Sequence, residues 1–272
     1  MFLIRLTVLN IFKYILILSS TGSNAVDSLL KWAEEWQLTV SVDKCCVLNI
    51  GQIVLLPELK MHNEVLPNVN SICDLGINVT SYLSPSDHVC DIAAKAHKCA
   101  SLIHRCFVSH NTDLLVLAYK VYVRPLLEYN SVIWSPFTIR DIETLESVQR
   151  RFTKRIRGLH SLPYKLHLQR LNLQSLEHCR LLTDVVWCYK IVFGLVTVNS
   201  KDLFEFSTVT LTRGYRYKLF KKSNSQNIRT TFFCECVINI WNKLPADMDF
   251  YSLSKFKHTI GAMDFSGYLQ CF

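Results

Sequence analysis

The sequence lacks the short motifs by which most enzyme classes are recognised. It contains no Cys-x-x-Cys pair, no Asp-Asp dipeptide, no glycine-rich phosphate loop, no Gly-x-Ser-x-Gly and no His-Glu-x-x-His. Only 8 glycines and 7 prolines occur in 272 residues, which excludes collagen-like and linker-like chains. We therefore predict no catalytic residue, no metal site and no bound cofactor.

What the chain does contain is a large apolar fraction and an excess of positive charge. Half of it (50%) is hydrophobic and 11% is aromatic, which excludes a disordered protein and predicts a sizeable core. Lysine plus arginine number 30 against 22 acidic residues, so the formal net charge is +8. This excess of positive charge favours anionic partners. Whether the chain binds an anionic partner depends on how the charges are distributed along it.

The 11 cysteines do not resemble a disulfide framework, because their number is odd and their spacing irregular. They indicate a reducing compartment with mostly buried thiols. Three His-x-Cys pairs could suggest a metal site, but residues two apart on a helix point about 200° away from each other. Ligands at i+7 spacing lie roughly 10 Å apart along a helix, too far to share one ion. Structural thiols and surface histidines are favoured at the three pairs: His88/Cys90, His97/Cys99 and His104/Cys106.

The first 24 residues form an apolar leader with three possible interpretations. The run from Leu6 to Leu18 is interrupted by Asn10 and Lys13, and it is too short for a confident membrane-spanning helix. Arg5 before it and small residues after it imitate a secretory signal. The segment could also be a strand or helix start left by truncation of a larger protein. Location in the cytoplasm or nucleus is favoured, with secretion or membrane anchoring expected if residues 1–24 act as a signal.

Periodicity predicts an α+β fold that is mostly α. A small β-containing region should precede a helical region that begins near residue 81, and no internal repeat is present. Expected strands or extended pieces are 38–42, 46–50, 53–56 and 73–79. Expected helices are 26–36, 84–107, 113–123 with an end or kink near Pro125, 141–158 and 176–193.

The expected helix 141–158 carries the most interpretable charge. Its apolar residues fall in one arc of about 120°, and five cations fill the opposite arc: Arg150, Arg151, Lys154, Arg155 and Arg157. Arginine predominates, and its planar fork suits phosphate oxygens. The acidic residues lie nearer the N-terminus, as the helix dipole alone would favour. A phosphate-binding stripe and an ordinary solvated face therefore both remain open.

A second basic segment alternates cations with aromatic rings. Its cations are Arg213, Arg216, Lys218, Lys221, Lys222 and Arg229, and its rings are Tyr215, Tyr217 and Phe220. Such alternation fits a strand or groove that touches single-stranded nucleic acid. It fits an exposed β-hairpin equally well.

Several short motifs in order resemble the C-terminal half of a non-LTR (LINE-type, Jockey-like) retrotransposon reverse transcriptase. The resemblance covers about residues 25–260. Its motifs are Trp32…Trp36-Gln-Leu, Val42-Asp-Lys44-Cys45, Leu75-Gly76-Ile77, Asp87-His88…Lys95-Ala96, Tyr122-Val-Arg124-Pro125-Leu-Leu-Glu128-Tyr129, Trp134-Ser-Pro136, Leu145-Glu146-x-Val-Gln149-Arg150-Arg151-Phe152-Thr-Lys154 and Trp241-Asn242-x-Leu244-Pro245.

The resemblance implies a fold and a partner. Residues 25–80, with Lys44, Leu75 and Gly76, would be the end of the polymerase palm, and residues 81–272 a thumb-like region. Such a region would bind RNA or an RNA/DNA duplex, with no small-molecule substrate and no membrane. The intact family uses Mg²⁺ held by an aromatic-x-Asp-Asp turn, which this chain lacks. It would therefore be a truncated relative without polymerase activity.

The resemblance also implies that five Cys or His positions correspond to arginines of the family: His97, Cys99, His167, Cys179 and Cys236. We expect that restoring arginine there raises solubility or nucleic-acid affinity. The alternative is that these side chains belong to an adapted core.

A different class of function remains open, namely a non-enzymatic helical module that binds protein. Its candidate anchor side chains are Trp134, Trp187, Trp241 and the Phe232-Phe233 pair.

Overall fold

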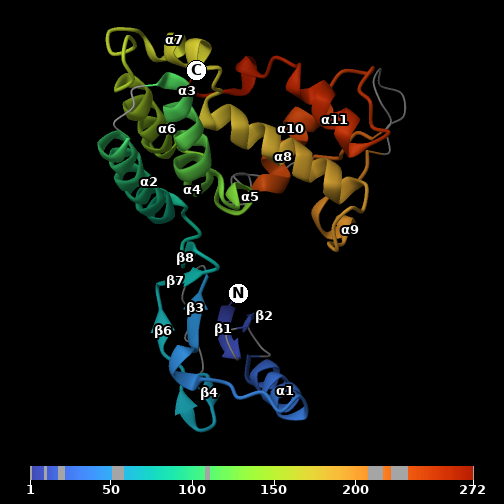
Figure 1. The fold of residues 1–272 in the computed structure, drawn as a ribbon. Helices are drawn as coiled ribbons and strands as arrows, with labels where there is room; N and C mark the ends of the chain where they lie inside the picture. Colours follow the sequence, from blue (N-terminus) through green and yellow to red (C-terminus); the bar gives the residue numbers. More distant parts are fainter. Residues whose placement is uncertain are drawn as a thin grey trace. The chain divides into compact units, whose positions relative to one another are not determined.

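The structure is a computed structural model that describes residues 2–8, 11–17, 22–50, 58–107, 111–207, 217–221 and 232–271. The fold is α+β and mostly α, as the sequence predicts (Figure 1). The chain divides into two compact units, Met1–His88 and Val89–Phe272, and each is described by itself.

The first unit is built on a four-stranded sheet in the order β2-β1-β3-β6. Strands β1 (Phe2–Val8) and β2 (Ile11–Ile17) are antiparallel, and β1 also pairs antiparallel with β3 (Cys46–Asn49). Strand β6 (Asn68–Val69) is parallel to β3. Two segments of the apolar leader, residues 2–8 and 11–17, thus form strands of this sheet.

Helix α1 (Gly22–Glu35) supplies the apolar face that packs in this unit. Its buried Val26 and Leu29 meet Val47 of β3 and Met61 of β4 (Lys60–Met61), which pairs with β5 (Glu64–Val65). The period of 3.6 residues in the sequence places these side chains on one side of the helix. The expected helix 26–36 is therefore present and begins four residues earlier.

A tight hairpin connects β7 (Ser71–Asp74) and β8 (Ile77–Thr80). Its two turn residues, Leu75 and Gly76, have positive φ angles of 44° and 83°. Two positive φ values are typical of the turn that matches the twist of paired strands, and glycine favours it. The expected extended segment 73–79 is thus a hairpin.

The strand expected at 38–42 is not formed. Residues Val42–Lys44 make a 3₁₀ turn instead, in which Lys44 N–H donates to the Ser41 carbonyl. Alternating residues favour a strand only when a neighbouring strand accepts its backbone hydrogen bonds. The expected piece at 53–56 lies outside the described residues.

The second unit begins with two long helical segments. Helix α2 (Ser86–Cys106) is followed by α3 (Thr112–Ala118), a π-helical turn η2 (Tyr119–Val123) and α4 (Arg124–Glu128). The chain therefore stays helical through Pro125, where an end or kink was expected. The missing proline N–H is accommodated because the Arg124 N–H donates to the Tyr119 carbonyl, five residues back.

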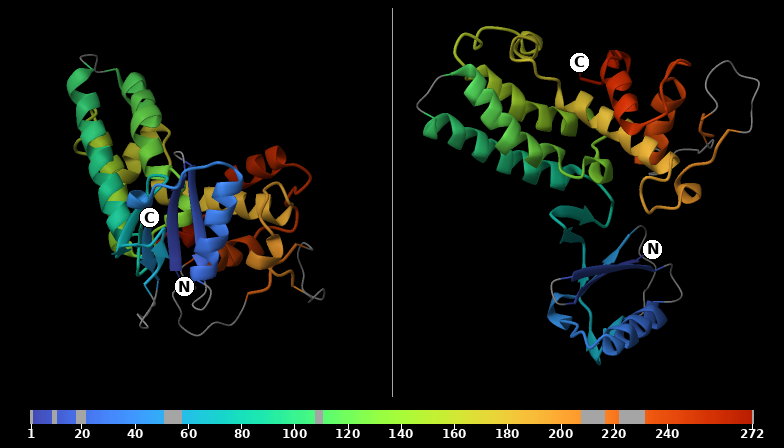
Figure 2. Two further views of the ribbon diagram at one scale, coloured as in Figure 1. Left: turned by 90° about the horizontal axis from the view of Figure 1, so that it is seen from below. Right: turned by 45° about the vertical axis from the view of Figure 1, so that its right-hand side comes forward.

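Helix α6 (Ile139–Lys154) and helix α8 (Leu176–Val192) form the centre of this unit (Figure 2). The short helices α5 (Ser131–Trp134) and α7 (Tyr164–Leu171) flank them. Helix α6 ends four residues before Gly158, whose φ of 78° suits a residue without a side chain. Both long helices were expected from their periodicity.

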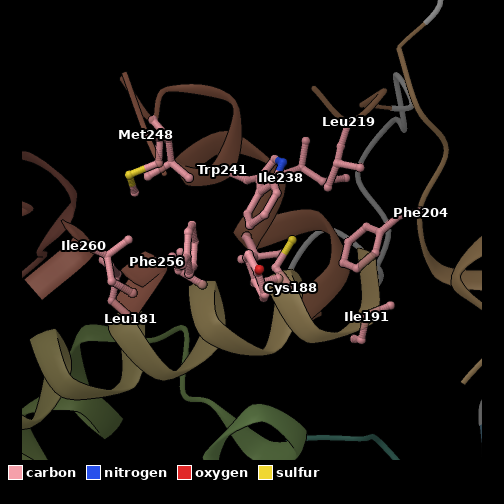
Figure 3. Packing of buried hydrophobic residues seen from close by; sticks show 14 of the residues in the cluster. Leu181, Cys188, Ile191, Phe204, Leu219, Ile238, Trp241, Met248, Phe256 and Ile260 are labelled. Carbon is pink, nitrogen blue, oxygen red and sulfur yellow. The ribbon is translucent and has the colours of Figure 1, made fainter. Parts of the chain in front are cut away.

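The main core of the unit lies where α8 packs against α10 (Phe233–Asn242) and α11 (Leu253–Gly261) (Figure 3). Trp241 is fully buried, and its indole N–H donates to the Tyr217 carbonyl at 2.8 Å. Asn242 bonds both backbone groups of Leu219, at 2.8 and 2.7 Å. The Trp-Asn pair thus fixes the segment 217–221 against α10. A short helix, α9 (Ser200–Leu203), precedes this segment.

Within the described ranges, no helix is long and apolar enough to cross a membrane.

Candidate nucleic-acid interface

Helix α6 separates an apolar face from a charged face as its sequence predicts. Ile142, Leu145, Val148 and Phe152 are all buried. Thr138 caps the helix, because its hydroxyl oxygen accepts the Asp141 N–H at 3.2 Å. The cap and the apolar stripe fix the rotation of the helix, and this directs the basic residues of its last turns outward.

Four of the five cations predicted for this helix are exposed: Arg151 and Lys154 in its last turn, and Arg155 and Arg157 just after its end. Within the described part of the chain, no ion pair joins any of the four to a carboxylate. Arg150 differs. It pairs with Glu143 at 3.0 Å and lies over the Tyr164 ring, 5.2 Å from its centre. Arg150 therefore has structural partners, whereas the other four have their charge available.

Helix α2 adds two histidines beside these arginines. His97 Nε2 lies 3.4 Å from Ser147 Oγ, and His104 Nε2 lies 3.2 Å from the Phe152 carbonyl. The Ser147 hydroxyl donates its proton to the Thr144 carbonyl at 2.7 Å, so its oxygen can accept from His97. Both histidines can thus donate Nε2–H toward α6 while Nδ1 remains available for a proton.

The electrostatic environment of both histidines reflects the basic surface. Partial burial lowers the pKa of His97, and the neighbouring Arg151 charge lowers it further. Burial and then Arg155 likewise lower the pKa of His104, against the opposing effect of its bond to the Phe152 carbonyl. The charge of Arg151 therefore acts on His97, and the charge of Arg155, the residue just after α6, acts on His104. We call these six residues, His97, His104, Arg151, Lys154, Arg155 and Arg157, the α2–α6 surface.

A buried polar network lies on the other side of α6. Glu146 accepts the Tyr164 hydroxyl proton at 2.5 Å and the Leu176 backbone N–H at 3.0 Å. Gln149 donates to Tyr164 at 2.9 Å and accepts from Tyr119 at 2.8 Å. The Glu146 and Gln149 residues of the resembling motif therefore join α6 to α7, α8 and η2, which the sequence did not reveal.

Two charged residues of α8 extend this network. Arg180 is 4% exposed, and its Nη1 and Nη2 make no hydrogen bond within the described residues. Burial raises the pKa of Glu146, while its bond from Tyr164 and the Arg180 charge oppose the rise. Burial also raises the pKa of Asp184 to about 7, again opposed by Arg180. Glu146 and Arg180 are buried, so these two charges belong to the interior of the unit.

The remaining predicted site residues lie elsewhere. Lys44 is exposed in the 3₁₀ turn, and Leu75 and Gly76 form the β7–β8 turn, all in the first unit. Lys218 lies in the segment held by α10, half-buried. Arg213 and Arg216 lie outside the described residues. Among the predicted site residues that the structure describes, the cations at the end of α6 and just after it are the ones that lie together.

Two of the expected anchor side chains for a protein partner are core residues. Trp134 is 4% exposed and donates to the Tyr129 carbonyl at 2.8 Å, and Trp241 is buried as described above. Trp187 is half-buried at the surface of α8. The expectation of anchors at Trp134 and Trp241 is wrong, because their ring N–H groups are bonded to backbone inside the fold.

Two of the five expected arginine positions are also buried and have partners. His167 Nε2 donates to the Leu159 carbonyl at 2.7 Å, and Cys179 accepts from Arg124 Nη2 at 3.1 Å. His88 is buried too and accepts the Asn78 N–H, so it is not the surface histidine that was expected. Among the described residues, no group of three His, Cys, Asp or Glu side chains could hold a metal ion.

Comparisons with known proteins give limited information about function. No family model matches the chain, and no solved structure matches it. An uncharacterized protein of Caenorhabditis elegans is 30% identical over 129 residues. The alignment covers 46% of this chain and 65% of that relative. Function therefore has to be inferred from the chemistry of the α2–α6 surface.

Proposed function

We propose that the helical unit binds the phosphate backbone of nucleic acid through the α2–α6 surface. The observation that carries this proposal is the set of four exposed cations at the end of α6 and just after it, which have no ion pair within the described residues. Three of the four are arginines, which bind phosphate oxygens with two parallel hydrogen bonds. The resemblance to a non-LTR reverse transcriptase supports RNA or an RNA/DNA duplex as the ligand.

In this proposal the protein is a truncated reverse-transcriptase-like chain that binds but does not polymerise. Polymerase chemistry needs carboxylates that hold two metal ions at the reacting phosphate. The sequence has no Asp-Asp pair for this purpose. Purified protein should not extend a primer with Mg²⁺ or Mn²⁺. Extension that exceeds a mock-purified control would contradict this part of the proposal.

Salt titration tests the binding itself. We compare the wild-type chain with the triple variant Arg151→Gln, Lys154→Gln, Arg155→Gln on an RNA/DNA duplex. Each lost phosphate contact should reduce the slope of log affinity against log salt by about 0.7 to 0.9, or about 2 to 3 in total. Arg150 is left in place because of its bonds to Glu143 and Tyr164.

A charge-matched control distinguishes binding at the α2–α6 surface from a nonspecific effect of the net positive charge. The variant Lys120→Gln, Lys165→Gln, Lys201→Gln also removes three exposed cations, which lie on η2, α7 and α9. It should keep the wild-type slope. Equal losses in both triple variants, with folding intact by circular dichroism, would reduce the α2–α6 surface to an ordinary solvated face.

One observation favours the alternative of a protein-binding module. The exposed apolar residues Leu114, Leu117, Val121, Leu126 and Tyr129 follow spacings of 3, 4, 5 and 3 residues. The five-residue step spans the π turn η2, whose wider turn keeps the stripe on one side of the helix. A protein partner bound there would be insensitive to salt, and binding to it would survive the Arg151/Lys154/Arg155 variant.

A further inference from the structure

A shallow groove lies between the second half of α8 and α11. Its volume is about 360 Å³, and it is lined by Leu182, Thr183, Val186, Trp187, Lys190, Lys257, Ile260 and Gly261. Leu182, Val186 and Ile260 make its apolar surface. Both helices belong to the main core of the unit, so the walls of the groove are rigidly supported.

The polar chemistry of this groove has one sign. Lys190 lies over the Trp187 ring, with Nζ 4.6 Å from the ring centre, and α11 contributes Lys257. No acidic side chain is among the lining residues. The groove therefore combines an aromatic ring, an apolar surface and two cations. This combination suits a ligand that has a flat ring and a negative charge.

A second groove in the same unit has aromatic rings but a different charge. The groove beside α9 and α10 has a similar volume, about 380 Å³, and contains Phe204, Phe220 and Phe232. Three carboxylates line it, Asp202, Glu205 and Glu235, against the single cation Lys201. An anionic ligand would be repelled there, so this acidic groove supplies an internal control.

We propose that the α8–α11 groove binds one unpaired nucleotide of a single-stranded nucleic acid. The base stacks on Trp187, and its phosphate lies between Lys190 and Lys257. The lysine stem is flexible, so the Lys190 ammonium can move from the ring to the phosphate when the base arrives. This site differs from the α2–α6 surface, and it does not rest on the duplex binding proposed above.

Fluorescence anisotropy of a labelled oligothymidylate of about ten nucleotides tests the proposal on the full chain. Trp187→Ala should weaken binding by about 5- to 150-fold, the range measured for loss of one base–aromatic stack. Trp187→Phe keeps a ring and should lose less. Phe232→Ala in the acidic groove is the matched control and should bind like the wild-type chain.

Two further variants test whether the two lysines contact phosphate and whether the ligand occupies the α8–α11 groove. Lys190→Gln with Lys257→Gln should reduce the salt slope by about 0.7 per phosphate contact. Gly261→Leu should block the groove, since a Cβ at this position meets no atom within 4 Å and the new side chain has room to enter it. All variants are checked by circular dichroism for an unchanged fold.

The outcomes separate this site from the other proposals. If the Arg151/Lys154/Arg155 variant loses duplex binding but keeps oligothymidylate binding, the two sites are independent. Wild-type affinity in both Trp187→Ala and Gly261→Leu would overturn the proposal. So would binding of a random glutamate–tyrosine copolymer, but not of oligothymidylate, in a manner that requires Trp187, because the groove would then serve an acidic peptide.

Discussion

The two ends of α6 use charged side chains in opposite ways. Near its start, Asp141 and Glu146 are 3% and 0% exposed, and each has hydrogen-bond partners inside the fold. Near its end, Arg151, Lys154 and Arg155 are exposed and have no internal ion pair within the described residues. The same helix therefore carries buried carboxylates with structural partners in its first half and, after the paired Arg150, exposed cations at its end.

This difference limits what the helix dipole explains. The dipole favours acids at the start of a helix and bases at its end, so it accounts for the order of the charges along α6. It does not account for the face on which each charge lies. Glu146 faces inward because Leu176 and Tyr164 supply donors there, whereas no described carboxylate pairs with Arg151, Lys154 or Arg155. Four predictions test this contrast, in order of decreasing expected effect.

The largest effect is expected when the buried carboxylate of α6 is removed. Glu146→Ala removes one of the carboxylates that face the buried Arg180 and leaves the Leu176 N–H and the Tyr164 hydroxyl without their acceptor, and should cost about 3–5 kcal/mol of unfolding free energy. Glu143→Ala on the same helix breaks only a pair that is 40% exposed and should cost at most about 1 kcal/mol. Urea unfolding measures both. Equal costs would show that Glu146 does not join the helices.

A second effect concerns the pH dependence of stability. The pKa of Asp184 is about 7 in the folded protein against an ordinary value of 3.8. The folded state therefore favours the protonated form, and this contribution is complete below about pH 4 and lost as pH rises through 7. At about 1.4 kcal/mol per pKa unit, the loss reaches about 4 kcal/mol.

Asp184→Asn mimics the protonated carboxyl and serves as the comparison. The variant should unfold like the wild-type chain near pH 4 and be more stable than it above pH 8. Thermal unfolding across this range measures the difference. A constant difference between the two proteins at all pH values would contradict the elevated pKa.

The third prediction compares buried and exposed positions among the five where arginine was expected. Cys179→Arg would bury a second guanidinium beside Arg124, and His167→Arg would remove two buried contacts, so each should destabilise the fold by about 2 kcal/mol or more. Cys236→Arg lies at an exposed position and should be nearly neutral. Chemical denaturation compares the three. A gain in stability at 167 or 179 would restore the original expectation of lost arginines.

The smallest effect concerns the two histidines of the α2–α6 surface. Arg151 and Arg155 disfavour their protonation in the free protein, and a bound phosphate would offset this repulsion. Duplex affinity should therefore rise as pH falls from 7 to 5, by roughly two- to tenfold per histidine. His97→Gln with His104→Gln should flatten this dependence in the same anisotropy assay. An unchanged pH profile in the double variant would place the histidines outside the binding surface.

The sequence predicted the long helices because each carries a sustained apolar period and a polar opposite face. Helices α2, α6 and α8 all lie within a few residues of their expected bounds. The short α10 and α11 were missed, since at 10 and 9 residues they are too short to show a sustained period. The expected strand 38–42 is reduced to a single bridge residue, Val40, because strand pairing depends on segments distant in the chain and is therefore a property of the tertiary structure.

The candidate site was partly visible for the same reason. The basic arc of α6 follows from its period, and four of its five cations are exposed as predicted. The roles of Glu146 and Gln149 could not be read, because their partners Leu176, Tyr164 and Tyr119 are 15 to 30 residues away in the chain.

The sequence by itself determined the long helices and which face of each is charged, because periodicity and capping are local properties. Only the tertiary structure decided which charges are held inside the fold and which remain for a ligand. It did so because a charge can be buried only where distant segments bring a donor or a counter-charge to it. The same packing of distant segments placed Lys257 of α11 beside Trp187 and Lys190 of α8 to make the groove.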